Sequence, residues 1–112
     1  MSGTRRLIVG ISGASGIVLG VRMLRALREC AVETHLVMTR SAKVTLAHEL
    51  TLKVADIESL ADHVHSIDDI GAAISSGSFK TAGMVVAPCS IRSLSEIATG
   101  VTSNLLTRAA DV

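Results

Sequence analysis

The sequence predicts a doubly wound parallel α/β fold, because a short apolar strand, a polar turn and a helix follow one another three times. The predicted strands cover residues 7–9, 33–38 and 84–87. The first and last are uniformly apolar, as in strands that helices cover on both faces. In such sheets ligands bind at the carboxyl edge, where the strand order reverses. We therefore expect the three turns, residues 12–15, 39–41 and 89–93, to meet in one crevice.

The first turn has the pattern of an anion site. Gly10, Gly13 and Gly16 let the main chain adopt unusual angles and let a ligand approach it. The N–H groups of the following helical turn, with the hydroxyls of Ser12 and Ser15, are expected to face a phosphate. The spacing G-x-x-G-x-x-G is neither the dinucleotide fingerprint G-x-G-x-x-G nor an NTPase phosphate loop. A plain tight turn is the alternative.

Helical spacing follows each predicted strand. The expected helices begin at residue 17, cover residues 41–49 behind a Thr39 cap, and run from residue 91 to a stop at Gly100. Two more are expected over residues 56–63 and over residues 103–112, with Ser103 or Asn104 near the cap. Three parallel strands leave sheet edges open, so we expect either a portion of a longer protein or an oligomer that covers them.

Length and composition predict a single domain over residues 1–112. The 11 basic and 10 acidic residues are mixed along the chain, which argues against a nucleic-acid surface. No apolar run approaches the roughly 18 residues of a membrane span. Cys30 and Cys89 lie far apart without a C-x-x-C pattern, as in proteins of a reducing compartment. We therefore expect a cytoplasmic protein without a membrane segment.

The four histidines are interpreted as surface or loop residues, and no metal site is expected. His48 and Glu49 begin an H-E-x-x-H pattern, but Leu52 stands in place of the second histidine. His63 and His65 are two residues apart and are placed on opposite faces of a strand.

Five motifs carry a family resemblance. They are, in order, GISGASG, THLVMT, ISSGSFKTAGMVV, APCSIRSLSEIATG and NLLTRAADV. With them the chain resembles the UbiX family of flavin prenyltransferases over essentially its whole length. The resemblance implies a flavodoxin-like, Rossmann-like fold of three α/β/α layers, bound FMN, and a homo-oligomer, often a dodecamer. Many members of the family are labelled as subunits of aromatic-acid decarboxylases.

The resemblance also implies a reaction and the residues for it. Family members transfer a dimethylallyl group from dimethylallyl phosphate to reduced FMN, and the prenylated FMN serves UbiD-type decarboxylases. The matching cofactor-binding residues are Gly13, Ala14, Ser15, Thr39 (a serine in the family), Ser90, Ile91, Arg92 and Ser93. Glu49 matches an acidic residue near the prenyl donor, and it is expected to be catalytic together with Ser15.

When the family resemblance is set aside, the sequence itself allows other roles for these residues. Glu49 reads as a helix-surface glutamate, Arg92 as either a phosphate ligand or a solvated side chain, and Cys89 as a small buried residue or a nucleophile. In the family the chain continues beyond the last motif and supplies an arginine for FMN and a tyrosine and a lysine for the donor phosphate. We therefore expect an N-terminal portion of such a protein. A non-catalytic FMN-binding accessory subunit and a flavin-dependent cysteine decarboxylase are the alternatives.

Overall fold

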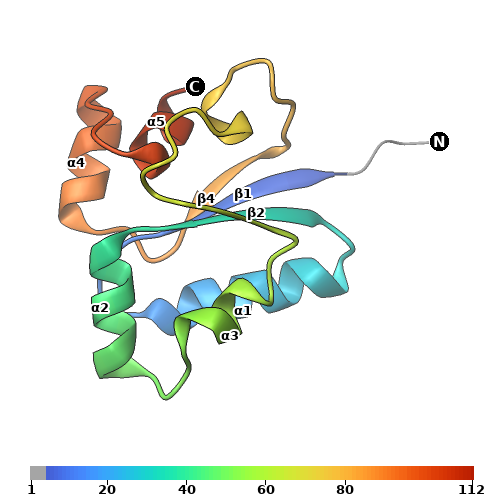
Figure 1. The fold of residues 1–112 in the computed structure, drawn as a ribbon, viewed down its shortest axis with the longest axis vertical. Coiled ribbons are helices and arrows are strands. Elements are labelled where there is room, and N and C mark those ends of the chain that lie inside the picture. Colours follow the sequence, from blue (N-terminus) through green and yellow to red (C-terminus); the bar gives the residue numbers. More distant parts are fainter. Residues whose placement is uncertain (1–4) are drawn as a thin grey trace.

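The computed structural model describes residues 5–112 and contains a four-stranded parallel sheet between layers of helices (Figure 1). The strands are β1 (Arg6–Ile11), β2 (Glu33–Met38), β3 (His63–His65) and β4 (Gly83–Val86), in the spatial order β3-β2-β1-β4. The helices are α1 (Ile17–Glu29), α2 (Arg40–Glu49), α3 (Val54–Glu58), the 3₁₀ turn η1 (Ala73–Ser75), α4 (Ile91–Thr99) and α5 (Leu105–Asp111). No helix within residues 5–112 is long and apolar enough to cross a membrane.

Each face of the sheet has its own hydrophobic core. Val9 and Ile11 of β1 pack with α1, α2 and α3 on one face. Ile8 points the other way, because successive strand residues face opposite sides, and it packs with η1 and α5. Figure 1 shows these helices on the two sides of the sheet. The predicted three-layer, flavodoxin-like architecture is confirmed.

The strand order reverses between β1 and β4. The chain builds β2 and β3 outward on one side of β1, and then returns to place β4 on the other side. Val9 of β1 is in register with Leu36 of β2 and with Val85 of β4. The loops that follow β1, β2 and β4 therefore leave the sheet at the same edge, where ligands bind in sheets of this kind.

The strand β3 is not among the three strands predicted for the sheet, although His63 and His65 are placed on a strand in the interpretation of the histidines. The prediction of a helix over residues 56–63 is wrong at its C-terminal end, because α3 ends at Glu58 and His63 is the first residue of β3. This edge strand has only three residues, two of them histidines, so no apolar run marks it. Its pairing with β2 creates the strand.

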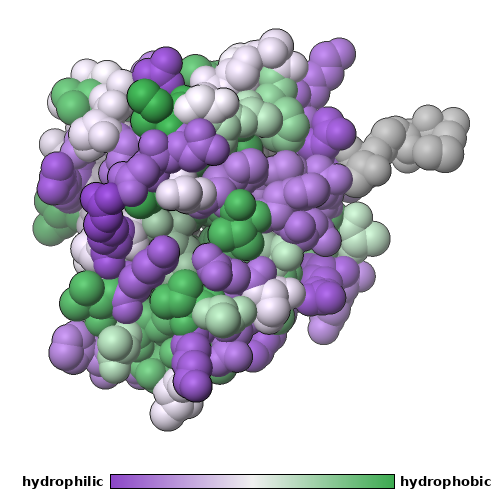
Figure 2. All heavy atoms as spheres, viewed as in Figure 1, coloured by the Kyte–Doolittle hydropathy of each residue, from purple (hydrophilic) through white to green (hydrophobic). Residues whose placement is uncertain are grey.

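Helix α4 is confirmed, and it ends at Gly100, whose φ of 75° is in the left-handed region that glycine favours. Its apolar residues are only partly covered. Ile97 packs against the core that contains α5, whereas Ile91 and Leu94 are 87% and 59% exposed. Figure 2 shows hydrophobic residues at the surface between hydrophilic ones, including at the edge where α4 lies. This helix therefore presents an uncovered apolar surface.

Candidate functional site

The three predicted turns meet in one cleft of about 570 Å³ at the carboxyl edge of the sheet. Its lining residues are Gly13, Thr39, Arg40, Ser41, Ile67, Asp68, Ser90, Arg92, Ser93, Glu96, Ser103 and Asn104. The predicted convergence of the turns is confirmed. Polar and charged side chains predominate, and Ile67 is the large aliphatic residue in the wall.

Three helices begin at this cleft. The side chains of Thr39, Ser90 and Asn104 cap α2, α4 and α5, accepting hydrogen bonds of 3.1, 3.1 and 3.0 Å from backbone N–H groups. The residue types explain these caps, because short oxygen-bearing side chains satisfy N–H groups that have no partner within the helix. A helix N-terminus carries partial positive charge, so three of them together favour an anion.

The first and second turns are in direct contact at Gly13. A Cβ atom at this position would lie 2.4 Å from the hydroxyl oxygen of Ser41 and 2.9 Å from its carbonyl carbon. Only a residue without a side chain fits between these two turns. Gly13 is thus required for the close approach of the two loops, whereas the sequence predicts the approach of a ligand at this glycine.

Ser12 ties the first and third turns together. Its hydroxyl donates to the carbonyl oxygen of Pro88 at 3.0 Å and accepts from the N–H of Ser90 at 2.6 Å, and its side chain is fully buried. The peptide bond between Ala87 and Pro88 is cis. The expectation that the Ser12 hydroxyl faces a ligand is therefore wrong, because it serves to join two loops.

A carboxylate occupies the N-terminus of α1. Glu49, the last residue of α2, accepts hydrogen bonds from the N–H groups of Gly16 at 3.1 Å and Ile17 at 3.2 Å. In this structure the side chain of Glu49 thus occupies the N–H groups at the start of α1, and the phosphate expected at this turn stays a prediction. Glu49 is exposed and lies outside the lining of the cleft.

A second carboxylate lies inside the cleft. Glu96 accepts from the hydroxyl of Ser103 at 2.6 Å and from Nε of Arg92 at 3.1 Å. The Ser103 hydrogen bond holds the pKa of the Glu96 carboxyl below its ordinary value, and Arg92 contributes in the same direction. Arg92 is both exposed and paired with Glu96, so neither of its sequence-based interpretations describes it fully.

The cleft gathers some of the predicted site residues and not others. Its lining contains Gly13, Thr39, Ser90, Arg92 and Ser93, whereas Ala14, Ser15, Ile91 and Glu49 lie outside it. The contribution of each to ligand binding or catalysis remains a prediction. Sequence reasoning did not assign Asp68, Glu96 and Ser103 to the site. Ser103 was recognised only as a potential helix cap, and Asp68 lies in an irregular connection that follows β3.

The interpretation of the histidines is wrong for His35. This residue is buried in β2, and its ring stacks against those of His63 and His65 with centroid separations of 4.5 and 5.2 Å. The prediction that His63 and His65 lie on opposite faces of a strand is also wrong, because both belong to β3 and side chains two residues apart on a strand share a face. The three rings therefore form one stack.

The fold and the cleft define a class of protein, the doubly wound α/β proteins with a cleft at the carboxyl edge of the sheet. The sequence profile of the flavoprotein family matches residues 1–112, and the chain belongs to that family. It is 59% identical over 110 residues to a probable UbiX-like flavin prenyltransferase of Sedimentibacter hydroxybenzoicus, covering 96% of this chain and 57% of the relative. It is 55% identical over 109 residues to the flavin prenyltransferase UbiX of Escherichia coli K12, covering 96% and 58%.

Solved structures agree with these sequence relationships. The complex of AnUbiX (PadA1) with FMN and dimethylallyl pyrophosphate superposes with a TM-score of 0.96 at 44% identity, over 97% of this chain and 58% of that one. A dodecameric FMN-dependent UbiX-like decarboxylase from E. coli O157:H7 gives 0.92 at 50% identity, over 95% and 58%. The chain thus spans a little more than half the length of the proteins it matches. The cysteine decarboxylase SpaF, at 22% identity and a TM-score of 0.73, shares the fold.

Proposed function

We propose that residues 1–112 form the FMN-binding domain of a flavin prenyltransferase, which transfers a dimethylallyl group from dimethylallyl phosphate to reduced FMN. The observation that carries this proposal is the meeting of three capped helix N-termini, at Thr39, Ser90 and Asn104, in one cleft. Such a site suits the phosphate of FMN. The names of the relatives and the ligands of the AnUbiX structure supply the activity and the substrates.

The donor set fits the phosphate end of FMN. Gly13, Thr39, Ser90, Arg92 and Ser93 combine a close main-chain approach, hydroxyl groups and a guanidinium group on the walls of the cleft. Ala14 and Ser15 of the first turn and Ile91 at the start of α4 complete the proposed FMN site. Phe79, the one aromatic residue in the sequence, is not in the cleft lining. The flavin ring would therefore rest on aliphatic and main-chain groups, with Ile67 as the apolar wall.

Glu49 and Ser15 are the proposed catalytic residues. Joining an allylic carbon to the flavin releases phosphate and a ring proton, so a carboxylate that can take up and return a proton is useful. The two N–H groups of Gly16 and Ile17 hold the carboxylate of Glu49 in place beside the first turn. Ser15 is exposed in that same turn and is free to contact the substrates.

A homo-oligomer is part of the proposal. Ile91 and Leu94 on α4 and Val101 just after it are exposed by 87%, 59% and 52%. Large apolar side chains that are exposed near one another along the chain are candidates for an interface between subunits. The dodecameric UbiX-like protein from E. coli O157:H7 supports a large assembly.

The proposal also includes a recipient and a location. Prenylated FMN would pass to a UbiD-type decarboxylase, which would use it as a cofactor. A cytoplasmic location is supported by Cys30 and Cys89, which are both free thiols in the structure.

Mass spectrometry of the flavin tests the proposal. The purified protein is incubated anaerobically with reduced FMN and dimethylallyl phosphate, and a flavin heavier by one prenyl unit is expected. Bound but unmodified FMN would instead favour the accessory-subunit alternative. Absence of both product and bound FMN would contradict the proposal as a whole.

A further inference from the structure

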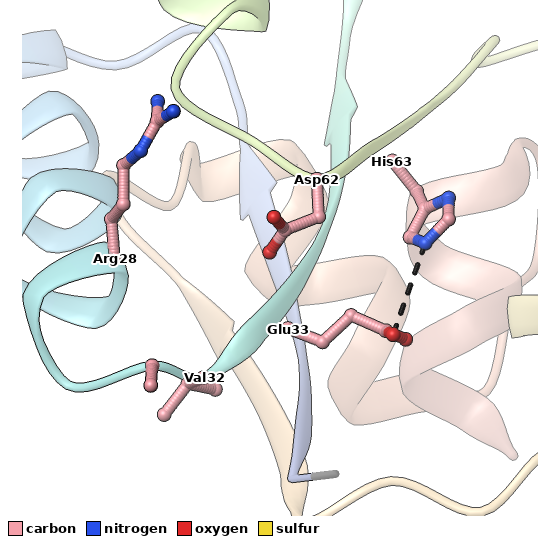
Figure 3. Close-up of a pocket in the computed structure, with 6 residues that line it drawn as sticks. Arg28, Val32, Glu33, Asp62 and His63 are labelled. Carbon is pink, nitrogen blue, oxygen red and sulfur yellow. Dashed lines mark ion pairs between the residues drawn. The ribbon is translucent and has the colours of Figure 1, made fainter.

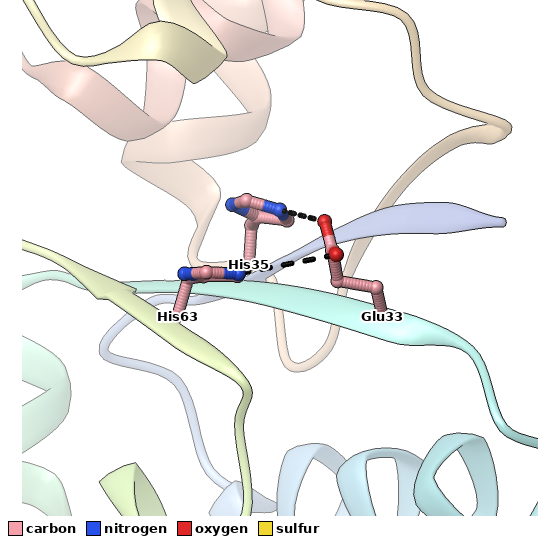
Figure 4. Close-up of side chains that lie close together, drawn as sticks. All are labelled: Glu33, His35 and His63. Atoms are coloured by element: carbon pink, nitrogen blue, oxygen red, sulfur yellow. Dashed lines mark hydrogen bonds and ion pairs between the residues drawn. The ribbon is translucent and has the colours of Figure 1, made fainter. Parts of the chain in front are cut away.

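A cluster of one carboxylate and two histidines lies at the amino end of β2 and β3, away from the cleft at the carboxyl edge. Glu33 and His35 come from β2, and His63 begins β3 (Figure 4). Parallel pairing places His35 directly beside His63. Glu33 and His35 share a face of β2 because they are two residues apart. The strands themselves therefore bring these three side chains together.

The donor atoms of the cluster converge. One ligand atom from each of Glu33, His35 and His63 lies within 4.8 Å of the others. One carboxylate oxygen of Glu33 is 2.8 Å from Nε2 of His35, and the other is 3.9 Å from Nε2 of His63. Two imidazoles and one carboxylate are a common ligand set for zinc, with water in the remaining position.

The surroundings hold the first two ligands in position. His35 is buried, and its Nδ1 is 2.9 Å from Nε2 of His65. Arg6 donates to the carboxylate of Glu33 at 2.9 Å. Metal-binding histidines and carboxylates normally have such outer partners, which fix the orientation of the ligand. The rings of His35 and His65 also stack, with their centroids 5.2 Å apart, so His65 packs directly against the buried ligand.

An ion can reach the cluster from solvent. Glu33 and His63 line an open cleft of about 480 Å³ together with Arg28 and Asp62 (Figure 3). Asp62 uses its carboxylate to accept from the N–H of Thr34 at 2.8 Å, so it lies beside the cluster as part of the strand structure. The cleft thus provides an entry path.

We propose that Glu33, His35 and His63 bind a divalent transition-metal ion of the zinc class. Zinc ligands lie about 2.0–2.2 Å from the metal, which places tetrahedral ligand atoms about 3.4 Å from one another. The 2.8 Å separation between Glu33 and His35 must therefore widen, and the 3.9 Å separation between Glu33 and His63 must shorten. The rings of His35 and His63 are nearly parallel, with an interplanar angle of 17°. His63 must therefore turn so that its Nε2 points at the same ion, and its side chain is 53% exposed and has room to do so. The site departs from the sequence-based expectation that no histidine binds a metal.

Calorimetric titration with ZnCl₂ tests this site. The protein is used without an affinity tag, after dialysis against a chelator, in a Cys30→Ser background that removes the exposed thiol. We expect one zinc ion per chain, and we expect His63→Ala to weaken binding by at least about tenfold. His48→Ala is the matched control, because His48 is an exposed histidine on α2 outside the cluster, and it should bind zinc like the parent.

A spectroscopic measurement accompanies the titration. Zinc should shift the ring NMR signals of His35 and His63 and leave those of His48 in place. Far-UV circular dichroism checks that the His63→Ala variant is folded. Equal zinc affinity in the His63→Ala and His48→Ala proteins would identify an adventitious ion only and overturn the proposal, as would the absence of binding by the parent.

Discussion

The hydroxyl of Ser12 accepts a hydrogen bond of 2.6 Å from the N–H of Ser90, which lies 78 positions further along the chain. This contact joins the loop after β1 to the loop after β4, the two loops on either side of the point where the strand order reverses. The same hydroxyl donates to Pro88, so both of its hydrogen-bonding roles are used. The walls of the cleft are therefore held together by a group that is itself buried.

Replacing Ser12 by alanine should destabilise the protein. The substitution leaves the N–H of Ser90 and part of the Pro88 carbonyl without a partner, at a cost of about 1–3 kcal/mol in the free energy of unfolding. Urea unfolding followed by far-UV circular dichroism measures this, because the chain has no Trp or Tyr for fluorescence. Ser15→Ala, in the exposed part of the same turn, is the control and should change stability by less than about 0.5 kcal/mol. Equal stability of the two variants would refute the structural role of Ser12.

Gly13→Ala should separate the first and second turns. Its Cβ would meet both the side chain and the main chain of Ser41, so one loop must move. We expect FMN affinity to fall by at least about tenfold, equivalent to about 1.4 kcal/mol. Gly77→Ala is a matched control, because a Cβ at Gly77 meets nothing within 4 Å. Titration of FMN fluorescence measures both affinities, and unchanged FMN binding in Gly13→Ala would show that the contact is not needed.

Glu96 should make stability depend on acid pH. Its folded-state pKa is lowered, chiefly by Ser103, so its carboxyl binds protons less readily in the folded than in the unfolded chain. The ionised Glu96 carboxyl therefore adds its full contribution to the free energy of unfolding at pH values above its unfolded-state pKa, about 4.3. This contribution is lost as the pH falls through the lower pKa that Glu96 has in the folded state.

Glu96→Gln should therefore lose stability less steeply than the parent as pH falls from about 5 to 3. Thermal unfolding at a series of pH values gives the two curves. Glu29→Gln, on the exposed face of α1, serves as the control and should follow the parent. Superposition of the Glu96→Gln curve on that of the parent would disprove the assignment.

Glu49→Gln should separate binding from chemistry. The amide oxygen can still accept from Gly16, so the turn keeps its shape and FMN affinity should stay within about threefold of the parent. Loss of the ionisable group should lower the rate of prenyl transfer by about 10²–10⁴-fold. Single-turnover assays with quantified product test this, with Glu29→Gln again as the control. A normal rate in Glu49→Gln would exclude Glu49 as the acid or base.

Much of the cleft follows from local sequence signals. A hydroxyl residue directly after an apolar strand is a recognisable helix cap, and this signal predicts Thr39. Ser90 is predicted as a site residue by the family resemblance, and the structure adds its role as the cap of α4. Gly13 was found because glycines gather after the first strand. These signals need no knowledge of distant parts of the chain.

The remaining features depend on tertiary contacts. Asp68 follows an edge strand, β3, that becomes a strand only by pairing with β2. His35 is buried because the rings of His63 and His65 stack on it, and those residues lie about 30 positions away. The occupation of the α1 N-terminus by Glu49 arises in the same way, from the packing of α2 beside the first turn. Contacts between residues that are distant in the sequence produce no periodic pattern along the chain, so the sequence alone does not predict them.

The most direct test of the central claim compares the binding of FMN with that of riboflavin, which lacks the phosphate. If the capped N-termini at Thr39, Ser90 and Asn104 hold the phosphate, FMN should bind with one molecule per chain and at least about tenfold more tightly than riboflavin. Inorganic phosphate should compete with FMN and not with riboflavin. Equal affinities for the two flavins, or no binding of FMN, would contradict the account.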